Sequence, residues 1–415
     1  MKMGSKNATT KKRILYCESN TDGTVGGSFF SLLYLVEGID KAYFDPVVIF
    51  HSDNSLVPTY RKSGIDTRIQ RKPTPYGFAQ RIRKYGLAGN VLGKTLSPIQ
   101  KMLNFSRFLI NPVFRKYYYL KKNKIDIVHL NNSIIRNNDW MIAAFWARIP
   151  CITHERGINA HYPKLARWIA QRLDAIVCIS NAVADNLKQK GVPENNIRII
   201  YNGLDPEIVK VTRQSLELRD EYGIQHDAPI IGIIGNIKQW KGQKSVVLAT
   251  ALIKKQFKEI RCFIVGDTAD ADIDYKYELD ELIRKHGLEE NIIFTGHQSN
   301  VADYMNLMDV VIHASVLPEP FGRVLIEAMA LKKPLIGARA GAVPEIIINN
   351  KTGLTFQPDN ASNLASCIIS LLKDPDLARN MGAEGYTRLI ETFSIQSNVQ
   401  KTTAIYDSIL YRPAH

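Results

Sequence analysis

The chain has 415 residues, of which 45% are hydrophobic and 23% charged, and its formal net charge at pH 7 is +14. This length exceeds one ordinary hydrophobic core, so two domains are expected, and the composition excludes a low-complexity protein. No apolar run approaches the roughly 20 residues that cross a bilayer. The polar residues 1–12 are expected to be a disordered lead-in, because they lack the apolar core of a secretion signal.

The first half of the chain alternates short apolar runs with helical stretches. Buried parallel strands are expected at residues 13–19, 45–51, 126–132, 150–155, 175–180 and 197–203. Helices are expected at residues 28–38, 138–147, 163–172 and 181–190. Residues 13–205 are therefore predicted to form a doubly wound N-terminal domain. Most of the five cysteines lie in such strands, which favours buried free thiols in a reducing cytoplasm.

A basic insert, residues 71–122, interrupts this alternation with bulky apolar and basic residues. Between Arg61 and Lys124 there are sixteen Lys or Arg residues and one acid, Asp66. This concentration marks one face of one domain rather than a nucleic-acid-binding protein. The insert is interpreted as a helical hairpin that covers the sheet, with solvated lysines, or as an amphipathic surface on an anionic membrane; binding of a protein helix in a groove and binding of nucleic acid are the lesser alternatives. On such a membrane each Lys or Arg contributes about 1 kcal/mol.

The second half repeats the alternation and predicts a second doubly wound domain, residues 206–393. Its strands are expected at residues 228–236, 261–267, 291–296, 309–315 and 334–338. The polar stretch 205–228 is the expected connection between the domains, and residues 394–415 are expected to hold a terminal helix. In both domains ligands are expected at the carboxyl ends of the strands.

The segment PEPFGRVLIEAMA, residues 318–330, follows the predicted strand that ends at Ser315. Its second part favours a helix, so Gly322 lies near a helix N-terminus, where free N–H groups and the helix dipole favour a phosphate. Glu327 lies five residues into that helix, roughly 7.5 Å along its axis, and suits hydroxyls beside the phosphate. Glu319 precedes the helix. The two glutamates are thus predicted to contact different parts of one ligand.

The same segment resembles the E-x7-E motif of retaining glycosyltransferases of family 4, which have the two-domain GT-B fold. Other segments resemble that family's motifs in the same order along nearly the whole chain: DGTVGGS (22–28), THERG (153–157), IIYNGLD (199–205), IGNIKQWKG (234–242), GDTADAD, FTGH and AGAVPEIIINNKTG (340–353). The resemblance implies two Rossmann-like α/β domains that face each other across a cleft. It also implies a C-terminal helix that crosses back to the first domain.

The resemblance also implies a role for each matching residue. Glu327 would hold the ribose of a nucleotide-sugar, Glu319 would face hydroxyls of the donor sugar, and Lys241 would pair with the diphosphate. The helix amides of Gly322, Arg323 and Val324 would share the stabilisation of charge on the departing nucleotide. His154 would lie across the cleft at the donor sugar, and Gly26 and Gly27 would line the acceptor side.

One position departs from the family pattern. Where an arginine usually follows the glycine after the first strand of the donor domain, this chain has Gly235 and Asn236. An amide offers a hydrogen bond where arginine offers a charged bidentate pair. Lys238 or Arg323 is hypothesised to supply the missing charge; otherwise the donor would bind weakly.

No metal or cofactor is expected. The run DADID (270–274) imitates a calcium loop, but Tyr275 stands where that loop needs glycine. In the GT-B fold lysine and backbone amides take the place of a metal, and DGTVGG lacks the spacing of a nicotinamide-binding loop. The donor is expected to be a UDP-, GDP- or ADP-sugar.

These observations predict a retaining, metal-independent transfer of a sugar to a hydroxyl acceptor, in the assembly of cell-surface polysaccharide or glycolipid. The basic residues 61–124 suggest a lipid-linked saccharide or an acidic polysaccharide as acceptor, and a cytoplasmic protein that lies at the inner face of the membrane if this segment binds it. Three alternatives stay open: a sugar-nucleotide epimerase, a phosphorylase, and a catalytically idle scaffold that binds membranes or partners, for which Asn236 is the support.

Overall fold

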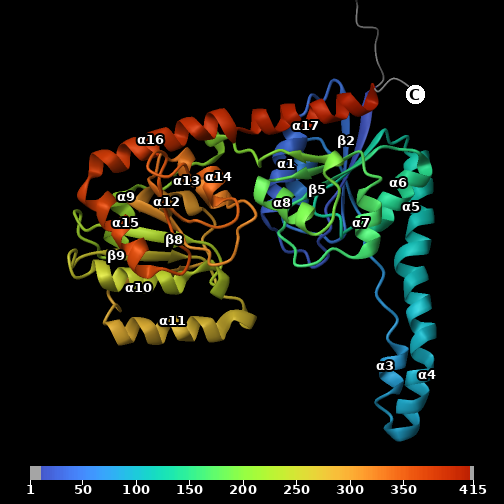
Figure 1. Ribbon diagram of the computed structural model, residues 1–415, viewed down its shortest axis with the longest axis horizontal. Coiled ribbons are helices and arrows are strands. Elements are labelled where there is room, and N and C mark those ends of the chain that lie inside the picture. Colours follow the sequence, from blue (N-terminus) through green and yellow to red (C-terminus); the bar gives the residue numbers. More distant parts are fainter. Residues whose placement is uncertain (1–10, 412–415) are drawn as a thin grey trace, which may run out of the picture. The chain divides into compact units, whose positions relative to one another are not determined.

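The computed structural model describes residues 11–411, apart from the side chains of residues 86–89 (Figure 1). The chain divides into two compact units. The N-terminal unit comprises Met1–Ile179, Ala184–Ile200 and Val399–His415, and the C-terminal unit comprises Ser180–Val183 and Tyr201–Asn398. Residues 1–10 of the predicted lead-in lie outside the described residues. Its last residue, Lys12, was wrongly included, because the first strand begins there.

The N-terminal unit is built on a seven-stranded parallel sheet with the order β3-β2-β1-β4-β5-β6-β7. The strands are β1 (Lys12–Cys17), β2 (Phe44–Phe50), β3 (Asp66–Ile69), β4 (Ile127–Leu130), β5 (Cys151–Glu155), β6 (Ala175–Cys178) and β7 (Ile197–Ile199). Six of them match the predicted apolar runs. The sequence analysis missed β3, because this edge strand, DTRI, is only half-buried and carries charged residues.

Helices flank this sheet and form the insert. The flanking helices are α1 (Gly27–Gly38), α2 (Val57–Lys62), α6 (Asn138–Ala147), α7 (Lys164–Ala170) and α8 (Asn181–Gln189). The insert folds as α3 (Phe78–Ile82), α4 (Gly86–Phe105), the π-helical turn η1 (Ser106–Ile110) and α5 (Asn111–Lys122). Figure 1 shows α3 beside α4, and α5 packs against α6. In the described residues no helix is both long and apolar enough to cross a membrane.

The C-terminal unit holds a six-stranded parallel sheet with the order β10-β9-β8-β11-β12-β13. The strands are β8 (Ile230–Ile234), β9 (Arg261–Val265), β10 (Ile292–Gly296), β11 (Val310–His313), β12 (Leu335–Ala338) and β13 (Leu354–Phe356). The helices are α9 (Ser215–Glu221), α10 (Gln243–Ile253), α11 (Ile273–His286), α12 (Val301–Leu307), α13 (Arg323–Ala330), α14 (Val343–Ile346), α15 (Ala361–Lys373) and α16 (Pro375–Thr392). The sequence analysis missed the three-residue strand β13 and the helix α9, which lies within the predicted connection.

The last helix, α17 (Ile395–Leu410), passes from one unit to the other at Val399. Its buried residues Thr402, Tyr406 and Ile409 recur at intervals of four and three, so one stripe of the helix packs into the N-terminal unit. The structure therefore confirms the predicted fold: two doubly wound α/β units and a terminal helix that returns to the first. All five cysteines are free thiols, and four are buried.

In both sheets the strand order reverses once, between β1 and β4 and between β8 and β11. At such a point the loops at the carboxyl ends diverge and leave a crevice in which ligands bind. The predicted site residues lie at or beyond the carboxyl ends of β1, β5, β8 and β11.

Candidate functional site

The carboxylate of Glu319 is the centre of a polar cluster in the C-terminal unit. Its Oε2 lies 2.9 Å from Nζ of Lys241 and 3.2 Å from Nε2 of His313. The hydroxyl of Ser315 donates to the same oxygen at 3.1 Å. The side chain of Glu319 is only 12% exposed. Three donors thus converge on one oxygen of a carboxylate that is largely shielded from solvent.

These partners decide the protonation state of Glu319. Burial by itself raises its pKa, but the hydrogen bond from His313 and the charge of Lys241 outweigh burial and lower the pKa to about 2. Glu319 is therefore ionised at neutral pH. It can accept hydrogen bonds from sugar hydroxyls, but it cannot serve as a general acid.

The backbone beside Glu319 requires glycine at two positions. Gly322, the residue before α13, has φ +87°, a left-handed conformation that other residues rarely adopt. Gly341 has φ +58°, and a Cβ there would lie 2.2 Å from the carbonyl oxygen of Glu319. That carbonyl accepts a hydrogen bond of 2.9 Å from the amide of Ala342. The loop after β12 thus packs directly on the backbone of Glu319.

Glu327, on α13, has a different partner from Glu319. Its Oε1 lies 3.1 Å from the guanidinium of Arg323, one helical turn earlier, and both side chains are about one-fifth exposed. Arg323 and the half-buried Val324 are the first two residues of the helix, at its positive dipole end. The structure brings Glu319, Gly322, Arg323, Val324 and Glu327 together on one strand–loop–helix segment.

The loop after β8 carries the residues that depart from the family pattern. Gly235 has φ +141°, while the side chain of Asn236 is exposed and forms no hydrogen bond within residues 11–411. Nζ of Lys238 lies 3.3 Å from a carboxylate oxygen of Asp272. Both Lys238 and Arg323 therefore already have acidic partners, and the hypothesis that one replaces the missing arginine stays a prediction.

In the N-terminal unit, His154 at the end of β5 belongs to a buried chain of hydrogen bonds. Its Nδ1 lies 2.8 Å from Nε2 of His129, whose Nδ1 lies 2.5 Å from the hydroxyl of Tyr406 on α17. That hydroxyl is 2.9 Å from the hydroxyl of Tyr16. Burial lowers the pKa of His129 to about 3 and that of His154 well below its usual range, so both rings are neutral. The predicted contact of His154 with the donor sugar remains a prediction.

The two glycines assigned to the acceptor side lie at the start of α1. Gly26 caps the helix with φ −111°, which any residue adopts, and a Cβ there would meet no atom within 4 Å. Gly27 is the first residue of the helix. Gly26 is thus needed neither for the turn nor for packing within the chain, and the acceptor contact stays a prediction.

No group of three or more His, Cys, Asp or Glu side chains within the described residues is placed to hold a metal ion. The acidic run 270–274 forms a short 3-10 turn, Asp270–Asp272, and the start of α11, and Asp272 pairs with Lys238.

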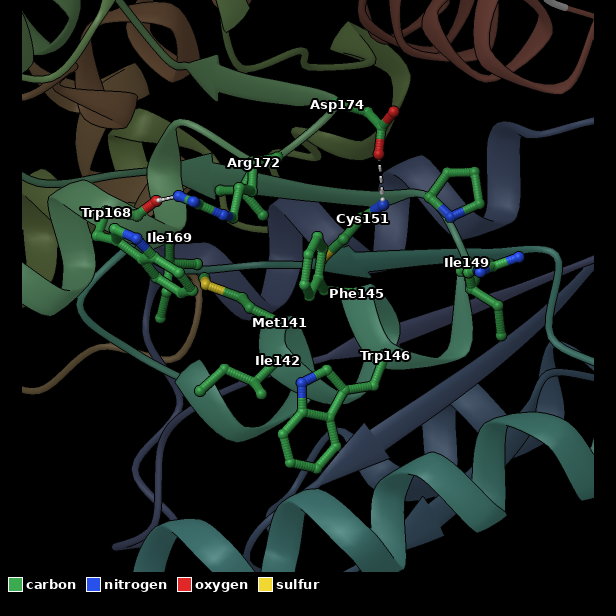
Figure 2. A pocket seen from close by; sticks show the side chains of 13 residues that line it. Met141, Ile142, Phe145, Trp146, Ile149, Cys151, Trp168, Ile169, Arg172 and Asp174 are labelled. Carbon is green, nitrogen blue, oxygen red and sulfur yellow. Dashed lines mark hydrogen bonds between the residues drawn. The ribbon is translucent and has the colours of Figure 1, made fainter. Parts of the chain in front are cut away.

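A cavity of about 530 Å³ lies in the N-terminal unit between α6 and α7 (Figure 2). The aromatic side chains of Phe145, Trp146 and Trp168 surround it together with Met141. It opens beside Cys151, at the amino end of β5. The ligand edge of a doubly wound sheet is the opposite one, so this apolar cavity is not the candidate active site.

The sequence analysis missed five residues of the two clusters: His313, Ser315, His129, Tyr16 and Tyr406. A signal was present for the first four, because each is within two residues of the carboxyl end of a strand, where the fold collects functional side chains. For Tyr406 no local signal existed, since it is one residue of an amphipathic helix.

Two doubly wound units, the second with a lysine and two glutamates beside the N-terminus of α13, have the architecture of GT-B proteins. Two family models match the chain: Glycosyltransferase Family 4 over residues 25–208, and Glycosyl transferases group 1 over residues 214–388. The chain belongs to this glycosyltransferase family, as the motifs predicted.

Two named relatives are similar in sequence to part of the chain. N-acetyl-alpha-D-glucosaminyl L-malate synthase of Bacillus anthracis is 30% identical over 254 residues, which are 61% of this chain and 65% of that protein. The lipopolysaccharide core biosynthesis mannosyltransferase LpsB of Rhizobium meliloti is 23% identical over 247 residues, 59% of this chain and 68% of LpsB. The chain thus matches about two-thirds of the length of these relatives.

Solved structures resemble this protein over most of its length. HepE of Anabaena in complex with UDP superposes with a TM-score of 0.78 at 22% identity, over 95% of this chain and 100% of HepE. A glycosyltransferase of Rickettsia africae superposes with a TM-score of 0.79 at 24% identity, over 98% of this chain and 100% of that one. These likenesses show that the fold is GT-B.

Proposed function

We propose that this protein transfers a sugar from a nucleotide-diphosphate sugar to a hydroxyl of an acceptor, with retention of configuration and without a metal ion. The observation that carries the proposal is the cluster at the start of α13. There Lys241 lies 2.9 Å from Glu319, and Glu327 lies on the helix that follows. A UDP-glucose complex of the related fold in Anabaena HepE supports the class of donor.

Each part of the cluster suits one part of such a donor. The ammonium of Lys241 and the first N–H groups of α13 stabilise the negative charge that develops on the departing diphosphate. The ionised Glu319 accepts hydrogen bonds from the sugar, and Glu327 accepts them from the ribose. Because cations and amides of the protein neutralise the diphosphate, the transfer requires no metal.

Retention of configuration follows from the family's E-x7-E motif and can arise by front-face attack or through a covalent intermediate. In the first case the departing phosphate oxygen takes the proton of the acceptor hydroxyl, so the protein supplies no general base. The ionised state of Glu319 at neutral pH fits its role as a stabilising carboxylate in this proposal.

A donor panel tests the proposed function. The protein is incubated with UDP-, GDP- and ADP-sugars, with and without a membrane lipid extract, and released nucleotide is measured. Release that depends on the extract, with an α-linked product from an α-linked donor, supports a retaining transferase. Release of no nucleotide by a folded protein indicates an idle scaffold, and conversion of the donor into its epimer indicates an epimerase.

The acceptor is proposed to be a lipid-linked saccharide at the inner face of the membrane, in polysaccharide or glycolipid assembly. The insert exposes bulky apolar side chains among its cations: Val91, Met102, Phe105, Phe114 and Tyr118 are all at least 49% exposed. Aromatic and basic side chains together favour the interface of an anionic bilayer. If the protein does not co-sediment with vesicles that contain anionic lipid at low salt, this part of the proposal is wrong.

A further inference from the structure

A second cavity in the N-terminal unit, of about 860 Å³, lies at the carboxyl edge of the sheet. The residues that follow β2, β3 and β4 line it, together with η1 and the first turns of α5 and α6. It therefore lies at the edge where this fold binds ligands, unlike the apolar cavity of Figure 2.

The cavity is strongly cationic. Its lining contains five cations, Arg71, Lys72, Arg107, Arg115 and Lys116, and a single acid, Asp139. The buried Lys116 forms an ion pair with Asp139, which neutralises both. Arg71 and Arg115 are exposed and have no acidic partner within residues 11–411. The uncompensated charge thus belongs to the remaining four cations, and it favours an anionic ligand.

A buried amide holds Lys72 at the cavity. Asn137 is 5% exposed, and its Oδ1 lies 3.4 Å from Nζ of Lys72 and 3.2 Å from Nε2 of His51. Both Lys72 and His51 line the cavity. The amide thus keeps the ammonium of Lys72 at the lining without neutralising its charge.

The start of the ten-residue helix α6 lies at the same cavity. Asn137 precedes its first residue with φ +54°, a left-handed conformation that asparagine adopts more readily than most residues. Asn138 and Asp139 of its first turn line the cavity, so the positive dipole end of α6 lies there. Cations and a helix N-terminus thus meet at one place.

The other wall of the cavity is apolar. Phe105, Phe108 and Leu109 line it from the end of α4 and from η1, and Leu165 lines it from α7. Phe105 and Leu165 are 56% and 42% exposed, which leaves apolar surface for a ligand. The π-helical turn that presents Phe108 and Leu109 is a rare conformation that often occurs at functional sites.

We infer that this cavity binds the phosphate group of an acceptor that also carries an alkyl chain, with the phosphate at Arg71, Lys72 and Arg115 and the chain against Phe105 and Phe108. The inference rests on the proposed function and deepens it, because it assigns the chemical group by which the acceptor is recognised. A phosphate accepts hydrogen bonds from all three polar groups, and the chain covers the apolar wall.

Calorimetric titration of the full-length protein tests this inference with three probes. These are dihexanoyl phosphatidic acid below its micelle concentration, dihexanoyl phosphatidylcholine with the same chains but no net charge, and inorganic pyrophosphate. We expect the phosphatidic acid to bind most tightly. Titrations in a Lys241→Ala background separate this site from the diphosphate site of the C-terminal unit.

Two variants remove the phosphate site. Asn137→Asp keeps an acceptor beside Lys72 and adds a negative charge there, and Lys72→Ala with Arg115→Ala removes two cations. Each variant is expected to weaken the binding of phosphatidic acid at least about tenfold. The matched control, Lys94→Ala with Lys101→Ala, removes the same charge from exposed positions outside the cavity and should bind as the wild type does. Thermal unfolding verifies that each variant folds.

Unchanged binding of phosphatidic acid by both site variants would overturn the inference, as would equal losses in the control. Binding of pyrophosphate that is tighter than that of phosphatidic acid would also overturn it, since the site would then take free phosphate. The donor panel tests the proposed function separately. If the protein binds phosphatidic acid at this cavity but releases nucleotide from no donor, the binding site is confirmed and the proposed function is refuted.

Discussion

Lys241 and Glu319 are 78 positions apart in the chain, yet Nζ of the lysine lies 2.9 Å from Oε2 of the glutamate. The contact joins the loop after β8 to the loop after β11, two strands that are neighbours in the sheet. The cation that would neutralise the diphosphate and the carboxylate that would bind the sugar therefore hold each other in place.

Replacing Lys241 tests its electrostatic role. We expect Lys241→Ala to lower the turnover of the donor at least about 100-fold, because the loss of one preorganised group at a developing charge costs that much. Lys244→Ala is the matched control. Lys244 lies three residues after Lys241, is exposed and pairs with Glu278. Nucleotide release by the two variants is compared with wild type. If Lys241→Ala keeps more than a tenth of wild-type turnover, the assigned role is wrong.

The low pKa of Glu319 predicts how stability depends on pH. Its folded-state pKa of about 2 lies below the ordinary value of 4.5, so the ionised group stabilises the fold above pH 4.5, and this contribution is lost as the pH falls towards 2. The contribution is about 3 kcal/mol at neutral pH. Between pH 4.5 and 2 the free energy of unfolding should therefore fall more steeply in wild type than in Glu319→Gln. Urea unfolding at several pH values measures both, and parallel curves would contradict the assigned ionisation.

The chain from Tyr16 to His154 predicts a tautomer. Within residues 11–411 the hydroxyl of Tyr16 has no acceptor except Tyr406, so the chain is satisfied when each group donates towards His154. His129 and His154 should then both carry their proton on Nε2. Nitrogen-15 NMR of histidine-labelled protein reads this directly, and a proton on Nδ1 of His154 would contradict it. Tyr406→Phe should mix the tautomers and destabilise the fold by about 1–3 kcal/mol.

The departure at Asn236 leads to a test of donor affinity. If Arg323 or Lys238 contacts the diphosphate, replacing that residue with alanine should weaken binding of the nucleotide about tenfold, as expected for one charge-assisted hydrogen bond. Arg284→Ala, in the exposed last turn of α11, is the control. Fluorescence or calorimetric titration with UDP, GDP and ADP provides the measurement. Unchanged affinity in both variants would show that neither residue compensates for Asn236.

Gly341 offers a test of how the loop after β12 positions Glu319. In Gly341→Ala the new Cβ would lie 2.2 Å from the carbonyl oxygen of Glu319, so the backbone must shift. Gly223→Ala is a matched control, because Gly223 has φ +61° and open space at the Cβ position. Both variants lose about 1–2 kcal/mol through the left-handed backbone, but only Gly341→Ala should also lose donor turnover. Equal turnover in the two variants would mean that the contact does not position Glu319.

Much of the fold was predictable because the strands are buried on both faces. Residues 14–17 of β1, for example, are fully buried, and such runs appear as continuous apolar segments. The edge strand β3 and the short strand β13 escaped prediction, since the former is half-buried and the latter has three residues. The segment from Glu319 to Glu327 was recognisable because its residues are consecutive in the chain and belong to one strand–loop–helix unit.

The sequence by itself determined the two doubly wound units, the E-x7-E segment and the concentration of charge in residues 61–124. These depend on the order of residues along the chain and on local burial. Only the tertiary structure decided that Lys241, His313 and Ser315 share one oxygen of Glu319, that Tyr406 reaches His129, and that Asn137 meets Lys72 at a cavity. Such contacts join distant segments, and their geometry is set by strand order and helix packing, which no local pattern in the sequence records.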